Sequence, residues 1–86
     1  MEYIPVHLYN SVKKLRDIRD FLTRSSDRNN EHAIQAMIKL IDVTIRRIHD
    51  INSIPRQGIA IIESMDPYNI SSLSVKLYNL QTYLCA

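Results

Sequence analysis

The side chains with the most direct chemical potential in this 86-residue chain are three histidines and one cysteine. No two of His7, His32 and His49 are three or four residues apart, so no helix face presents a pair of metal ligands. A metal pair would require a hairpin that brings His7 and His32 together. Cys85 is next to last, where neither a positioned base nor an electropositive pocket is expected to activate a thiol. We therefore predict no metal site, no cofactor and no catalytic residue.

The carboxylates lie beside basic residues or near expected helix ends. Asp42, for example, precedes Arg46 by four residues, which is the spacing of an ion pair on a helix. An acid and base pair would instead need two carboxylates isolated in an apolar setting that separates their pKa values. The single glycine also excludes the glycine-rich loops that bind phosphates. We predict that the protein is not an enzyme.

The size and composition of the chain indicate one small domain over residues 1–86. With 86 residues, 45% of them hydrophobic, the chain is long enough for one compact domain and too short for two. One cysteine excludes internal disulfides and suits a reducing compartment. No signal-peptide pattern opens the chain, and no stretch approaches the ~18–20 apolar residues of a membrane span. We expect a cytoplasmic protein.

Helical periodicity appears in the first and last segments. Pro5 suits the first turn of a helix, and the segment from about residue 5 to 24 carries a stripe of apolar residues at intervals of three and four. That stripe is Leu8, Val12, Leu15, Ile18 and Leu22. Asp66 and Pro67 predict the start of a last helix over about 67–84. Its stripe repeats at intervals of three and four, as in a coiled coil, and consists of Ile70, Leu73, Leu77, Leu80 and Leu84.

The segment from about residue 30 to 52 predicts a helix with two apolar faces. The first face is Ile34, Met37, Ile38, Ile41, Ile45 and Ile48. The second face is Ala33, Ala36, Leu40 and Val43. A helix that is apolar over most of its circumference is normally buried on two sides. Either this helix is central to its own domain, or its second face meets another chain.

The segment of about 55–65 contains the only glycine and is too short for periodicity to distinguish helix from strand. We predict a short helix, because the sequence offers no strong strand to pair with it. The fold class is therefore all-α. We expect a small helical bundle built on an antiparallel hairpin of residues 5–24 and 30–52, since the connection between them is short.

The residues without an obvious place in a single core indicate a protein partner. The last third of the chain is nearly uncharged but carries tyrosines, a residue type that supplies large contact area at protein interfaces. We predict a partner-binding surface formed by Ala36, Leu40, Val43, Tyr78 and Tyr83. The predicted function is a small non-enzymatic interaction module, such as an adaptor, an inhibitor or an assembly or chaperone subunit. Self-association as a homodimer is the favoured version.

The alternative function is a small regulator that binds DNA or RNA through its first helix. Its candidate contacts are Lys13, Arg16, Arg24 and Arg28. Phosphate binding needs several basic residues on one face, but Asp17, Asp20 and Asp27 interrupt this face, and the net charge is only +2. The sequence therefore favours the protein partner.

Overall fold

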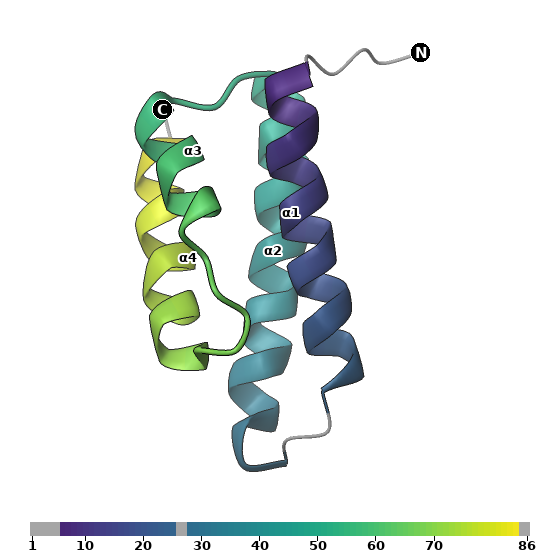
Figure 1. The fold of residues 1–86 in the computed structure, drawn as a ribbon. Helices are drawn as coiled ribbons and strands as arrows, with labels where there is room; N and C mark the ends of the chain where they lie inside the picture. Colours follow the sequence, from purple (N-terminus) through teal and green to yellow (C-terminus); the bar gives the residue numbers. More distant parts are fainter. Residues whose placement is uncertain (1–5, 26–27, 85–86) are drawn as a thin grey trace.

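Four α-helices make up most of the chain that the computed structural model describes, residues 6–25 and 28–84. They are α1 (Val6–Arg24), α2 (Glu31–Ile51), α3 (Arg56–Glu63) and α4 (Ile70–Leu84), with a 3-10 turn at Arg28–Asn30 before α2 (Figure 1). The predicted all-α bundle is confirmed, and the segment that could have been helix or strand is the helix α3. Pro5 and Cys85, singled out in the sequence, lie outside the described residues.

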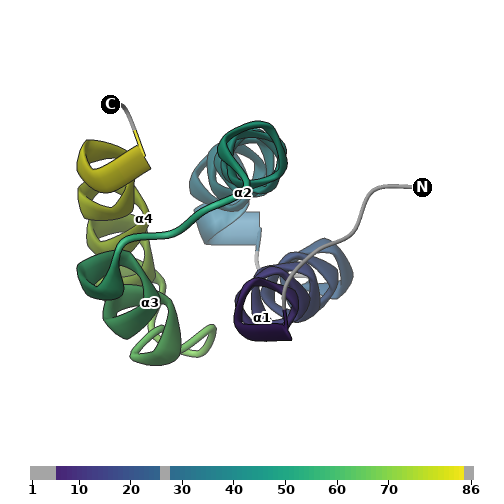
Figure 2. The ribbon, with the colours of Figure 1, turned by 90° about the horizontal axis from the view of Figure 1, so that it is seen from above.

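The helices form two antiparallel hairpins that lie side by side. In Figure 1, α1 and α2 run in opposite directions, as do α3 and α4, and α2 and α4 run the same way. Viewed from above, the helices occupy four corners in the order α1, α2, α4, α3 (Figure 2). Each helix therefore packs against two others: α1 against α2 and α3, and α4 against α2 and α3. The link after α2 crosses the top of the bundle to reach α3 (Figure 2).

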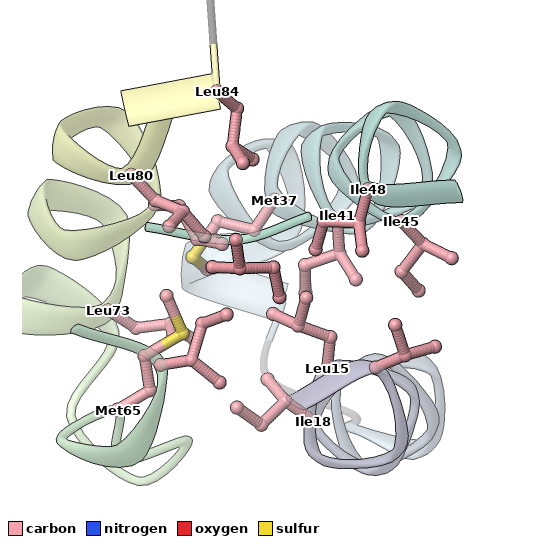
Figure 3. Close-up of a cluster of buried hydrophobic side chains, with 14 of the residues drawn as sticks. Leu15, Ile18, Met37, Ile41, Ile45, Ile48, Met65, Leu73, Leu80 and Leu84 are labelled. Carbon is pink, nitrogen blue, oxygen red and sulfur yellow. The ribbon is translucent and has the colours of Figure 1, made fainter. Parts of the chain in front are cut away.

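The predicted apolar stripes meet in the centre of this arrangement. All five stripe residues of α1 are buried, and Figure 3 shows Leu15 pointing toward Ile41 of α2 and Ile18 pointing into the middle of the bundle. The stripe of α4 is buried from Leu73 onward, whereas Ile70 at its first turn is only partly covered. On α2 the first predicted face is buried except for Ile38, which is half-exposed at its edge. Removing this apolar surface from water is the main favourable term for folding.

The single glycine marks the close approach of α3 and α4. Gly58 is buried in the first turns of α3. A Cβ atom at this position would lie 3.0 Å from Ile54 Cγ2 and 3.3 Å from Leu80 Cδ1. Such distances are shorter than ordinary carbon contacts, so a larger side chain would require Ile54 and Leu80 to shift.

Asn52 ends α2 and redirects the chain toward α3. Its backbone has φ 57° and ψ 34°, the left-handed conformation that asparagine tolerates better than most residues. Its N–H donates to the carbonyl of Ile48 at 2.8 Å and closes the last turn of the helix.

The start of α4 differs from the sequence prediction. Asp66 does not cap the helix; its Oδ1 accepts from the Tyr68 N–H at 2.9 Å, and its carbonyl accepts from the Asn69 N–H at 3.1 Å. These bonds close a turn. Asn69 is the actual N-cap, since its Oδ1 accepts from the Ser72 N–H at 3.1 Å. Asp66 and Asn69 are both residue types that cap helices. Because the chain forms a turn from Asp66 to Asn69, the helix begins only after Asn69.

Asn69→Ala should therefore lower the free energy of unfolding by about 1 kcal/mol, the usual cost of losing an N-cap side chain. Asp66→Ala should cost less, because it removes only a bond within an exposed turn. Asn69→Asp serves as the control that keeps the capping oxygen. Urea unfolding followed by circular dichroism measures all three. A larger loss for Asp66→Ala than for Asn69→Ala would contradict this assignment of the helix start.

Candidate functional site

A surface groove of about 460 Å³ lies between α2 and α4. Its lining residues come from the second apolar face of α2 and from the first half of α4. They are Ala33, Ala36, Met37, Lys39, Leu40, Val43, Ser74 and Tyr78. Four of the five predicted partner-binding residues are among them: Ala36, Leu40, Val43 and Tyr78.

The groove exists because α4 covers only part of the second face of α2. With α1 and α4 both packed against it, α2 is the central helix that one reading of the sequence anticipated. However, α4 has 15 residues and α2 has 21, and the first turns of α2 extend beyond the start of α4 (Figure 1). Val43 remains 44% exposed and Tyr78 71% exposed, while Leu40 is half-buried against the core. The second face is thus partly core and partly open surface.

Tyr83 does not belong to this groove. It follows Tyr78 by five residues on α4, which places it about 140° farther around the helix. It is 42% exposed, as predicted, and it is not among the lining residues. The structure therefore separates the two tyrosines that the sequence grouped together.

A polar network that the sequence did not reveal joins α2 to α4 beside the groove. Thr44 is fully buried; its hydroxyl donates to the carbonyl of Leu40 at 2.7 Å and accepts from Gln81 Nε2 at 2.6 Å. Gln81 Oε1 in turn accepts from an Arg47 guanidinium N–H at 3.2 Å. Hydrogen bonds inside an apolar contact favour one register of the two helices. Gln81 is 34 residues from Arg47 and 37 residues from Thr44, so no local sequence pattern predicts these hydrogen bonds.

Two lysines from neighbouring helices hold the C-terminal end of α3. Lys14 of α1 donates to the carbonyl of Glu63, and Lys76 of α4 donates to the carbonyl of Ser64 at 2.7 Å. The last carbonyls of a helix lack partners within the helix and carry partial negative charge. Both ammonium groups therefore have a structural role in tying α3 to the bundle.

The basic residues proposed for nucleic acid do not form one uniform surface. Lys13 Nζ lies 3.0 Å from Asp17 Oδ2, four residues later on the same helix, and the hydrogen bond and charge of that carboxylate raise the pKa of Lys13 above its ordinary 10.5. Arg16 and Arg24 are exposed on α1, and Asp17 and Asp20 lie with Arg24 around one shallow depression. Arg28 belongs to the 3-10 turn rather than to α1, and its side chain is outside the described part of the structure.

Another predicted pairing is corrected by the structure. Asp42 Oδ1 lies 3.1 Å from Arg19 Nε, so this carboxylate pairs across the hairpin with α1 rather than with Arg46 on its own helix. Asp42 faces α1 on the side of α2 away from the groove, where an arginine of the neighbouring helix can reach it. Both side chains are about half exposed, and the pair adds little stability.

His7 and His32 are far apart. His7 lies in the first turn of α1 and His32 in the first turn of α2, and the antiparallel hairpin puts these turns at opposite ends of the bundle (Figure 1). The idea that a hairpin brings them together is wrong. Among the described residues, no three His, Cys, Asp or Glu side chains gather in a way that could hold a metal ion.

Comparisons with protein-family models, curated proteins and solved structures give no match for this chain. Over the part of the chain that the structure describes, none of the helices combines the length and apolar character needed to cross a membrane.

Replacing the centre of the polar network should destabilise the contact between α2 and α4. Thr44→Val keeps the shape of the side chain but leaves the Gln81 amide nitrogen with only its 3.2 Å bond to the Leu77 carbonyl, and should cost about 1–3 kcal/mol of unfolding free energy. In combination with Gln81→Leu, the total loss should be smaller than the sum of the two single losses. Denaturant unfolding of the two single variants and the double variant measures this coupling. Additive losses would show that the two side chains act independently.

Proposed function

We propose that this chain is a small non-enzymatic protein-interaction module, and that the groove between α2 and α4 binds a helix of its partner. The observation that carries the proposal is the open, apolar lining contributed by Ala36, Leu40, Val43 and Tyr78. An adaptor, an inhibitor and an assembly or chaperone subunit all work through such a surface. A cytoplasmic location, expected from the sequence, remains a prediction.

The contrast between the groove and the core supports this role. The buried apolar residues of the four helices are at most 9% exposed, whereas Val43 and Tyr78 are 44% and 71% exposed. An amphipathic helix laid into an apolar groove is a common mode of protein recognition. Tyrosine is also one of the residue types that dominate binding energy at interfaces.

The dimensions of the groove suit a short helical segment. From Ala33 to Val43, α2 advances ten residues, or about 15 Å, which corresponds to roughly three turns of a docked helix. An interface of this length is at the small end of specific interfaces and is typical of transient complexes.

Nucleic-acid binding through α1 has weaker support. Lys13 is paired with Asp17, and Lys14 is engaged at the end of α3. Arg16 and Arg24 remain exposed, but acidic residues are interleaved with them. Counterion release needs several uncompensated phosphate contacts, and this face offers few.

The test of the proposal is Val43→Glu. Because Val43 is exposed and Leu40 packs against the core, Val43→Glu disturbs binding without the buried charge that Leu40→Glu would introduce. Val75→Glu is the matched control, since Val75 is 59% exposed on α4 and does not line the groove. We expect affinity capture from the source cells to lose specific partners with Val43→Glu and to retain them with Val75→Glu. Both variants should keep the thermal unfolding midpoint within a few degrees, because surface changes cost about ±0.5 kcal/mol.

Sedimentation equilibrium of the unchanged protein and of the Val43→Glu and Val75→Glu variants measures the oligomeric state of each. A dimer that Val43→Glu dissociates and Val75→Glu preserves would make a second copy the occupant of the groove. The proposal fails if Val43→Glu changes neither the captured proteins nor the oligomeric state.

A further inference from the structure

The apolar side of the groove has the spacing of a coiled-coil stripe. Ala33, Ala36, Leu40 and Val43 follow one another at intervals of three, four and three residues on α2. These intervals correspond to the a and d positions of two heptads. Ala33 and Ala36 have small side chains, which allow another helix to approach closely at that end.

A row of basic residues runs beside this stripe. His32, Lys39 and Arg46 lie at intervals of seven residues, so they share one side of α2 immediately next to the stripe. We call these three residues the basic row. All three are exposed, and Lys39 also lines the groove. Within the described residues, neither Lys39 nor Arg46 forms an ion pair.

Two acidic residues of α2 lie near this row. Asp42, between Lys39 and Arg46 in the sequence, is paired with Arg19 of α1. Asp50 follows Arg46 by four residues and lies beyond the part of α2 that lines the groove. The segment Ile70–Leu84 contains no Asp or Glu, and its only charged residue is Lys76, which is engaged at the end of α3. The groove is thus apolar along its length and positive along one border.

We infer that the groove takes an acidic amphipathic helix, whose apolar stripe packs on Ala33, Ala36, Leu40 and Val43 and whose flanking Asp or Glu residues meet the basic row. The inference rests on the proposed function and names the chemistry of the partner. In coiled coils, the charges that flank the apolar stripe select the partner and its orientation. Charges at the rim of an interface also speed encounter and exclude partners of like charge.

A second copy of this chain is a poorer occupant. A two-fold dimer places the same surface of both copies in the interface, so Lys39 of each copy would enter a contact whose groove lining contains no Asp or Glu. This repulsion opposes the homodimer that the sequence favoured.

Two synthetic peptides test the inference. Each has about three heptads with leucine at the a and d positions, and the flanking positions are glutamate in one peptide and lysine in the other. Fluorescence anisotropy at low salt measures their binding to the full chain. We expect the glutamate peptide to bind at least about tenfold more tightly than the lysine peptide, and this preference to shrink as salt screens the charges.

Charge-reversal variants of the protein test whether the preference for the glutamate peptide comes from the basic row. Lys39→Glu with Arg46→Glu should weaken the glutamate peptide by about tenfold and reverse the preference between the peptides. Arg16→Glu with Arg24→Glu makes the same change in net charge on α1, away from the groove, and should leave the preference intact. Val43→Glu should weaken both peptides, because it disrupts the apolar stripe that they share.

Several outcomes would overturn the inference. Equal effects of the two charge reversals would show that only net charge matters. Equal binding of both peptides, each weakened by Val43→Glu, would reject the acidic partner while leaving the proposed groove intact. Binding of neither peptide, with a dimer that Val43→Glu dissociates, would assign the groove to a second copy. Tight binding of duplex DNA that depends on Lys39 and Arg46 would assign the basic row to nucleic acid.

Discussion

The structure depends on α2 burying one broad apolar arc against two helices at once. Its face from Ile34 to Ile48 packs toward α1 on one side and α4 on the other, so α2 connects the two hairpins. The bundle has no strand to supply long-range hydrogen bonds within its described residues. Side-chain packing must therefore hold the hairpins together, and most of that packing passes through this one helix.

Polar groups then determine how the hairpins fit. The hydrogen bonds among Thr44, Gln81 and Arg47 fix α4 along α2, and Lys14 and Lys76 hold the end of α3 from both sides. Gly58 lets α3 lie close to α4. Apolar contacts alone are tolerant of sliding, whereas these contacts are satisfied only in one arrangement.

The groove is a consequence of the same arrangement. Because α4 is shorter than α2 and begins only at Ile70, the second apolar face of α2 is covered near Thr44 and left open from Ala33 to Val43. An open apolar stripe in a domain of this size carries a cost in solubility. The basic row beside it gives that surface a charge preference, and the proposed acidic helix would satisfy the stripe and the row together.

The sequence by itself determined the three long helices and their buried faces, because apolar intervals of three and four residues are set by the geometry of each helix alone. It left the short segment that forms α3 open between helix and strand. It also identified Ala36, Leu40, Val43 and Tyr78 as residues without a clear place in the core. Only the tertiary structure decided that these four share a groove, that Tyr83 does not, and that Asn69 rather than Asp66 begins α4. Those outcomes depend on how helices far apart in sequence pack and where a turn closes. The pairing of Thr44 with Gln81 arises in the same way, since a hydrogen bond across 37 residues leaves no local signature.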